Sequence, residues 1–150
     1  MSSEFSVRLM VAEDLDAVMS VEKDSFCTPW SRSSFEEELA KNRLARYIVA
    51  LDGSEVVGYA GTWLVINEAH VTNVAVRGSR RRQGIGRLLM ETLMVLARHE
   101  GMDSMTLEVR VANQAARRLY QQLGFVEAGL RKDYYSETKE DALILWREKL

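Results

Sequence analysis

The sequence has very little cysteine and proline and no long apolar run. Cys27 is its only cysteine, so the chain cannot form an internal disulfide, which is typical of a protein in a reducing cytosol. Pro29 is its only proline, which argues against a long disordered segment. No stretch approaches the roughly 18 apolar residues of a membrane-spanning helix, and residues 1–20 carry several charges, unlike a signal peptide. These absences predict a cytoplasmic protein that is not embedded in a membrane.

The sequence also lacks an excess of either charge and any cluster of metal ligands. Its formal net charge of −2 argues against general nucleic-acid binding. It has two histidines, His70 and His99, and no Cys/His cluster, so we expect no metal site. A chain of 150 residues, 47% of them hydrophobic, fits one globular domain spanning 1–150. A domain of this size buries roughly 68–70% of its unfolded surface, so it needs no disulfide or metal to fold.

Hydrophobic periodicity predicts strands and helices along the chain. Expected strands cover residues 5–11, 46–51, 55–66, a segment ending at 76, 105–111, 125–130 and 142–146. Expected helices cover residues 13–26, 31–42, 86–101 and 113–123, with Ser31 or Ser33 and Asn113 as N-caps and Gly124 as a left-handed C-terminal residue. The order β-α-α-β-β-β-α-β-α-β-β predicts an α/β (α+β) fold with a mixed sheet and helices on its faces.

A basic, glycine-containing turn connects the strand that ends at Val76 to the next helix. Free backbone N–H groups and the helix dipole favour an anion there, and Gly84 and Gly86 allow a phosphate to approach the backbone closely. The turn lacks the Gly-Lys-Ser/Thr ending of a P-loop, and Leu89 stands where a dinucleotide fingerprint needs its third glycine. The turn is therefore either a site for another phosphate ligand or a solvated basic turn. Five arginines add positive charge around it: Arg77, Arg80, Arg81, Arg82 and Arg87.

Two motifs carry a resemblance to a known family. Residues 81–86, Arg-Arg-Gln-Gly-Ile-Gly, resemble the Arg/Gln-x-x-Gly-x-Gly/Ala signature of the GNAT N-acetyltransferases, whose turn holds the pyrophosphate of acetyl-coenzyme A. Residues 107–113 and 118–125 are most similar to the bacterial ribosomal-protein-alanine N-acetyltransferases (the RimI type), which acetylate the N-terminal alanine of a small-subunit ribosomal protein. The resemblance covers nearly the whole chain and implies the GNAT acyl-coenzyme A N-acyltransferase fold.

The resemblance implies a role for each matching residue. Glu108 would be the general base, and Tyr120 would be the general acid. Pro29-Trp30-Ser31 and Asp133-Tyr134-Tyr135 resemble segments beside the acceptor groove, which implies Trp30, Tyr134 and Tyr135 as acceptor-binding residues. Contacts to acetyl-coenzyme A would come from the strand before the turn, from the turn and from a later helix cap: Val74, Ala75, Val76, Arg81, Arg82, Gln83, Gly84, Ile85, Gly86, Arg87 and Asn113.

Proton affinities limit how these two side chains can act. An α-ammonium has a pKa of about 7.7–8.0 and a glutamate about 4.3, so direct transfer to Glu108 is uphill by roughly 3.5 pKa units. Glu108 must therefore be desolvated or act through water. The leaving thiolate resembles cysteine, with a pKa of about 8.5 against about 10 for tyrosine, so Tyr120 helps as a hydrogen-bond donor. A backbone N–H near Val74 could stabilise the oxyanion.

Each residue also has a structural reading. Glu108 could form a cross-strand ion pair, Tyr120 could belong to the core, and Asn113 could be only an N-cap. Trp30 and the two tyrosines could be loop packing. His70 is a rival base near neutral pH, ranked below Glu108. Cys27 has no histidine near it in sequence, which favours an unused thiol.

The motifs together predict an acetyltransferase that acts on a protein N-terminal α-amine, with a ribosomal protein as its partner and no metal, nucleic acid or membrane. Within enzymes, the alternatives are other protein N-termini, internal lysines or a small-molecule amine. From another class, the chain could be a catalytically silent acyl-coenzyme A sensor. The sequence leaves the oligomeric state open.

Overall fold

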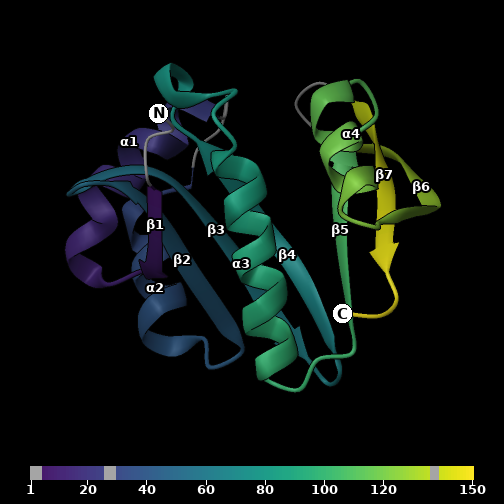
Figure 1. The fold of residues 1–150 in the computed structure, drawn as a ribbon, viewed down its shortest axis with the longest axis horizontal. Coiled ribbons are helices and arrows are strands. Elements are labelled where there is room, and N and C mark those ends of the chain that lie inside the picture. The colour runs from purple at the N-terminus through teal and green to yellow at the C-terminus, as the bar shows by residue number, and fades with distance from the viewer. Residues whose placement is uncertain (1–4, 26–29, 136–138) are drawn as a thin grey trace.

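The computed structural model describes residues 5–25, 30–135 and 139–150 (Figure 1). Its strands are β1 (Phe5–Leu9), β2 (Ala45–Asp52), β3 (Glu55–Val65), β4 (Glu68–Val76), β5 (Ser104–Arg110), β6 (Val126–Tyr135) and β7 (Glu140–Arg147). Its helices are α1 (Leu15–Ser25), α2 (Arg32–Lys41), α3 (Ile85–His99) and α4 (Gln114–Gln122), with 3-10 turns at Ala12–Asp14 and Gly78–Arg80. This order confirms the predicted succession of strands and helices.

The strands form one mixed sheet in the order β1-β2-β3-β4-β5-β7-β6. Neighbouring strands pair antiparallel except β4 and β5, which run parallel. Their pairing covers three positions, from Glu68 with Ser104 to His70 with Thr106. Beyond His70 the two strands separate, and Figure 1 shows them diverging toward the end of the sheet where α4 lies. The middle of the sheet therefore has an opening that no strand pairing closes.

Helices cover both faces of the sheet. The apolar stripe of α3, at Ile85, Leu89 and Leu93, recurs every four residues and packs into one core. The helices α1 and α2 pack into a second core on the other face. Tyr59 and Ala60, which are adjacent on β3, lie in different cores because successive strand residues point to opposite faces.

The predicted helix caps are confirmed. The Ser31 side chain accepts a hydrogen bond from the Ser34 N–H at 3.2 Å and begins α2. The Asn113 side chain accepts one from the Ala116 N–H at 3.2 Å and begins α4. Gly124 follows α4 with φ +93°, the left-handed conformation expected of it.

Several predicted boundaries differ from the structure. The last-but-one strand was expected over 125–130, but β6 extends to Tyr135, which puts both tyrosines of the Asp133-Tyr134-Tyr135 segment on a strand. The opening strand ends at Leu9, because a 3-10 turn occupies Ala12–Asp14 before α1. Cys27 and the predicted break at residues 26–29 lie outside the described residues. Within the described part of the chain, no helix is long and apolar enough to cross a bilayer.

Candidate active site

A cavity of about 370 Å³ occupies the opening between β4 and β5. It brings together residues that are far apart in the sequence, from α1, β4, β5, α4 and the end of β6. We call it the cleft. Its lining residues are Glu22, Trp30, Val71, Thr72, Asn73, Val74, Leu107, Glu108, Val109, Arg110, Asn113, Ala116, Tyr120 and Tyr135.

The edge of β4 that faces the cleft carries backbone groups that β3 does not use. In an antiparallel pair, successive residues direct their N–H and C=O groups toward opposite edges of the strand. The Arg77 N–H donates to the Val57 carbonyl at 2.8 Å, so the backbone of Ala75 faces β3. The backbones of Val74 and Val76 therefore face the open edge. Of the three predicted backbone contacts to acetyl-coenzyme A, this geometry favours these two over Ala75.

A bulge lies where β4 leaves β5. Asn73 pairs with Gly61 and Val71 pairs with Thr62, so Thr72 is an extra residue. A bulge of this kind increases the twist of a strand and interrupts regular pairing. Asn73 is 91% buried beside the cleft, with 9% of its surface exposed, and its Oδ1 has no partner among the described residues. The bulge thus turns the free edge of β4 toward the cleft.

Glu108 lies on β5, opposite Ile144 of β7. Its neighbours Leu107 and Val109 point into the core on the α3 face, so the Glu108 side chain points to the α1 face. There it is half-buried. Burial raises the pKa of both Tyr134 and Tyr135, and the negative charge of Glu108 adds to each shift. The carboxylate thus enters the cleft from the α1 face.

Tyr120 reaches the cleft from the other side. It belongs to α4 and to the core on the α3 face, is 8% exposed, and packs edge-on against Phe125 with ring centroids 5.9 Å apart. Burial raises the pKa of the Tyr120 hydroxyl to about 12, with a smaller contribution from Tyr135. The hydroxyl is therefore kept protonated at neutral pH and can donate a hydrogen bond.

The glycine turn presents backbone amides at the start of α3. Gly84 is the N-cap with φ +81°, and the first bond within the helix runs from the Leu88 N–H to the Gly84 carbonyl at 3.0 Å. The amides before Leu88 have no acceptor inside the helix. Ile85 is buried in the core, so it can offer only its backbone to a ligand. A Cβ on Gly84 would meet no atom within 4 Å, which leaves the backbone open to a phosphate.

Several arginines around this turn are engaged with protein groups. Arg80 forms ion pairs with Asp52 at 2.5 Å and Glu55 at 3.0 Å, so it fastens the turn to the β2–β3 hairpin. Arg77 donates to the Ser20 hydroxyl and the Val56 carbonyl. Both arginines lie beside the turn, as expected from the sequence, but their guanidinium groups are engaged with protein groups.

The three arginines predicted to contact acetyl-coenzyme A differ in how many hydrogen bonds their side chains make within the protein. Arg87 donates to Gln122 of α4 at 3.2 Å, and Arg81 donates to the Val76 carbonyl at 3.3 Å. Arg82 is exposed, has φ +65°, and finds no side-chain partner among the described residues. Arg82 is thus the most available cation beside the turn, together with the neighbouring Gln83.

The acceptor-binding residues predicted from the sequence are only partly brought together. Trp30 and Tyr135 line the cleft, whereas Tyr134 is 44% exposed and is not among the lining residues. The Arg110 guanidinium lies 3.9 Å from the centre of the Tyr135 ring and pairs with Glu140 at 3.1 Å. This cation–π contact holds Tyr135 against the wall of the cleft.

His70, the rival base, lies at the paired end of β4. Its Nε2 is 3.1 Å from a carboxylate oxygen of Glu68, and its ring packs edge-on against Trp146. It does not line the cleft. This placement favours Glu108 over His70 as the base.

Glu22, Asn73 and Arg110 line the cleft, and the sequence analysis did not single them out. Glu22 has a recognisable sequence signal. It follows Leu15 by seven residues and Val18 by four, so it falls on the apolar face of α1. A glutamate on that face must be buried with partners, and Glu22 is 1% exposed.

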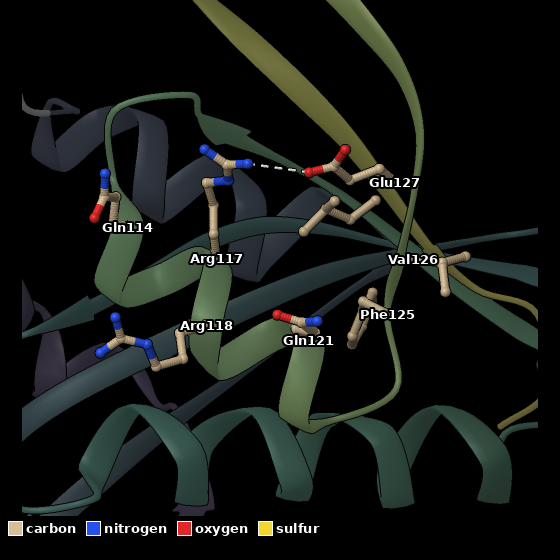
Figure 2. Close-up of a pocket in the computed structure, with 8 residues that line it drawn as sticks. Gln114, Arg117, Arg118, Gln121, Phe125, Val126 and Glu127 are labelled. Carbon is tan, nitrogen blue, oxygen red and sulfur yellow. Dashed lines mark hydrogen bonds and ion pairs between the residues drawn. The ribbon is translucent and has the colours of Figure 1, made fainter.

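A second cavity, of about 620 Å³, lies between α4 and β6 (Figure 2). It uses the face of α4 that carries Gln114, Arg117, Arg118 and Gln121, whereas the cleft uses Asn113, Ala116 and Tyr120. Figure 2 shows Arg117 reaching across to Glu127, with which it forms an ion pair at 3.1 Å. The cleft, and not this larger cavity, combines a carboxylate, a tyrosine and an open strand edge. In the described ranges, no group of three or more His, Cys, Asp or Glu side chains could hold a metal.

The chain is similar to known acetyltransferases. The acetyltransferase (GNAT) family matches residues 15–125. A relative from Bacillus subtilis is 38% identical over 146 residues, which cover 97% of this chain and 97% of the relative. The [ribosomal protein bS18]-alanine N-acetyltransferase of Escherichia coli K12 is 38% identical over 136 residues, which cover 88% of this chain and 89% of that protein.

The fold has the same likeness. The crystal structure of the ribosomal-protein-S18-alanine N-acetyltransferase from Escherichia coli matches this chain with a TM-score of 0.88 at 31% identity, over 98% of this chain and 96% of that one. The mixed α/β fold predicted from the sequence, and the family resemblance behind it, are confirmed.

Proposed function

The chain belongs to the GNAT family of acetyltransferases, and on this premise we propose that it transfers the acetyl group of acetyl-coenzyme A to a protein N-terminal α-amine, as one domain over residues 1–150. The observation that carries the proposal is that Glu108, Tyr120 and the open edge of β4 meet in one cleft. Glu108 enters from the α1 face and Tyr120 from the α3 face. Glu108 can therefore act on the amine and Tyr120 on the leaving thiolate from opposite sides of the cleft.

Acetyl-coenzyme A supplies the acetyl group as a thioester. The free amides at the start of α3 would hold its pyrophosphate, with Arg82 and Gln83 beside them. The backbone groups of Val74 and the N–H of Val76 would pair with its extended arm as a neighbouring strand does, and Asn113 at the start of α4 would complete the contacts. The Val76 carbonyl already accepts a hydrogen bond from Arg81. The open space at Gly84 supports this fit, because a phosphate needs the backbone unobstructed.

Glu108 takes the proton of the incoming α-ammonium. The gap of roughly 3.5 pKa units between a glutamate and an α-ammonium makes direct transfer costly in water. Loss of water on substrate binding raises the pKa of the Glu108 carboxyl and so reduces this difference, and an intervening water molecule could relay the proton where the two groups are not in contact. The Val74 N–H, on the open edge of β4, would donate to the carbonyl oxygen as it gains charge. An α-amine suits this weak base better than lysine, whose pKa is about 10.4.

Tyr120 donates a hydrogen bond to the departing sulfur. Its pKa of about 12 exceeds that of a thiol, about 8.5, so the hydroxyl stabilises the thiolate without giving up its proton completely. The raised pKa supports the expectation from the sequence that Tyr120 helps as a hydrogen-bond donor rather than by full proton transfer.

The proposed acceptor is the N-terminal alanine of a small-subunit ribosomal protein. The 38% identity to the Escherichia coli bS18-alanine N-acetyltransferase over 88% of this chain supports it. Trp30 and Tyr135 would flank the first residues of the acceptor, with Tyr134 beside them outside the cleft. A ribosomal acceptor is made in the cytoplasm, so the proposal includes action there.

Mass spectrometry of peptides tests the proposal. The protein is incubated with acetyl-coenzyme A and either an alanine-first peptide or the same peptide with a blocked N-terminus and one lysine. We expect one acetyl group on the free N-terminus and little modification of the blocked peptide. Preference for the blocked lysine peptide would overturn the acceptor assignment. Binding of acetyl-coenzyme A without transfer to either peptide, or to small amines, would instead identify a sensor.

A further inference from the structure

Glu22 is a buried carboxylate beside the cleft to which the proposed reaction gives no task. It is 1% exposed, in a helix face that otherwise packs into the core. Its Oε2 accepts a hydrogen bond from the backbone N–H of Trp30 at 2.8 Å, and its Oε1 accepts one from the Tyr59 hydroxyl. The two donors come from different parts of the fold. Trp30 precedes Ser31, the N-cap of α2, and Tyr59 is on the strand β3.

We propose that Glu22 is a positioning residue for the acceptor, because its carboxylate fastens Trp30 to the sheet at the wall of the cleft. The inference rests on the proposed function, in which Trp30 flanks the acceptor peptide. Glu22 acts through Trp30 and takes no proton from the substrate. It therefore differs from Glu108, the other carboxylate that lines the cleft.

The contacts around Trp30 show why one hydrogen bond matters there. The Trp30 ring packs against Phe35 with centroids 5.2 Å apart, and Phe35 packs edge-on against Tyr59 at 5.6 Å. The ring is thus held by dispersion contacts, which resist separation but allow sliding. The Glu22 bond fixes the backbone from which the ring extends. Tyr59 in turn holds Glu22. The Trp30 backbone is therefore linked through Glu22 to β3, a strand of the sheet that carries the cleft.

Two substitutions at Glu22 separate the contribution of its hydrogen bonds from that of its charge. Glu22→Leu keeps an apolar side chain on that face and removes both hydrogen bonds. Glu22→Gln removes the charge but can keep both bonds, since its carbonyl can accept from Trp30 and its NH2 group can donate to the Tyr59 oxygen. A positioning role requires the bonds and not the charge. The glutamine variant should therefore rescue the loss that the leucine variant suffers.

Steady-state kinetics with the alanine-first peptide measure this directly. We expect Glu22→Leu to raise the peptide KM by about ten-fold, as loss of a hydrogen bond to a charged group allows, while kcat and the acetyl-coenzyme A KM stay within two-fold. Glu22→Gln should stay within about three-fold of the unmodified protein. Trp63→Phe is the matched control, because its indole N–H donates from β3 to Glu38 of α2 at 2.7 Å and Trp63 does not line the cleft. It should lower Tm and leave the peptide KM unchanged.

Two kinetic results would overturn the inference. One is an unchanged peptide KM in a folded Glu22→Leu variant. The other is equal damage from Glu22→Gln and Glu22→Leu, which would assign the effect to charge. Amide hydrogen exchange provides a readout without substrate, so the inference remains testable if the protein acetylates neither peptide and the proposed function fails. Exchange at the start of α2 should be faster in Glu22→Leu than in Trp63→Phe, and equal rates would refute the positioning role.

Discussion

Tyr120 illustrates how burial determines the chemistry of a single side chain. Its hydroxyl lies at a cleft but its ring lies in the core, and burial raises its pKa to about 12. A tyrosine with this pKa stays protonated, and so can donate a hydrogen bond, throughout the pH range in which an α-amine becomes neutral. The leaving thiolate would therefore meet a donor at every working pH.

Replacing Tyr120 by phenylalanine should test this donor. The ring and its contact with Phe125 remain, so acetyl-coenzyme A binding should hardly change. A hydrogen bond to a charged group is worth about 1.5–3 kcal/mol, so kcat should fall roughly 10- to 150-fold. Trp63→Phe, which also removes an aromatic donor but lies outside the cleft lining, is the control and should keep its kcat. Unchanged turnover in Tyr120→Phe would leave that residue with a packing role only.

Glu108→Gln keeps the shape of the side chain and removes the basic oxygen. General-base assistance is typically worth about 10²–10⁴-fold, so a loss of that order is expected at pH 7. The loss should shrink toward pH 9, because the acceptor amine then arrives already neutral. Rates from pH 6 to 9 on the alanine-first peptide measure this. Glu127→Gln, which only breaks the ion pair with Arg117, is the control, and a deficit in Glu108→Gln that is independent of pH would argue for substrate positioning.

The sequence predicted those site residues that belong to short local motifs. Glu108, Tyr120 and Asn113 come from the family resemblance, whose motifs are continuous stretches of sequence on one strand and on one helix with its cap. Glu22 was missed, because its partners Trp30 and Tyr59 are brought to it by tertiary packing. The engagement of Arg80 with Asp52 and Glu55 was missed for the same reason, since ion pairs between distant segments leave no periodic pattern.

At the scale of elements, the start of α3 differs from its end in what a ligand could use. Gly84 precedes the helix with φ +81°, and Gly101 follows it with φ +90°. A Cβ at either position would meet no atom within 4 Å, so alanine there strains the backbone without any steric clash. Only the start of the helix offers free N–H groups. The two glycines are therefore a matched pair with different expected roles.

Gly84→Ala should weaken acetyl-coenzyme A binding, and Gly101→Ala should not. Both variants should lose about 1–2 kcal/mol of stability, the usual cost of a left-handed conformation for a residue with a Cβ. Isothermal titration with coenzyme A and urea unfolding measure the two effects separately. Equal affinity of the two folded variants would remove the turn from the proposed binding site.

The strand β6 shows where periodicity fails as a predictor. It was expected to end at Leu130, because Arg131, Lys132 and Asp133 interrupt the apolar alternation. The structure continues the strand through irregular pairing between Arg131 and Tyr135, with Asp133 at φ +52°. Since this strand lies at the edge of the sheet and is exposed, no buried face imposes a pattern on it. The elements that pack into a core, such as α3, were predicted closely.

The stability of the whole molecule should depend on pH at the alkaline end. Unfolded tyrosine has a pKa of about 10, so between pH 10 and 12 the unfolded chain releases protons that Tyr120 keeps in the folded state. The free energy of unfolding should therefore be intact below pH 10 and fall above it. Burial also raises the pKa of Tyr47 and Tyr59 in the folded protein, which extends the loss to higher pH.

Urea unfolding of the unmodified protein and of Tyr120→Phe isolates one contribution. Tyr120 should account for about 2–3 kcal/mol of the decrease between pH 10 and 12, from a shift of about two pKa units at 1.36 kcal/mol each. The difference in unfolding free energy between the two proteins should shrink by that amount over this range. A difference that does not vary with pH would show that Tyr120 ionises equally in both states.

The exposed edge formed by β6 has a consequence for how copies of the chain meet at high concentration. A long, regular edge strand is a template on which another chain can add a strand, and such growth leads to aggregates. Irregular pairing near Gly129 and again before Tyr135 bends β6, and Arg131 and Lys132 place charge between these points. A second copy approaching in register would meet like charges and a broken ladder of hydrogen bonds. The irregular pairing of β6, whose full length the sequence pattern did not predict, thus also opposes aggregation through its open edge.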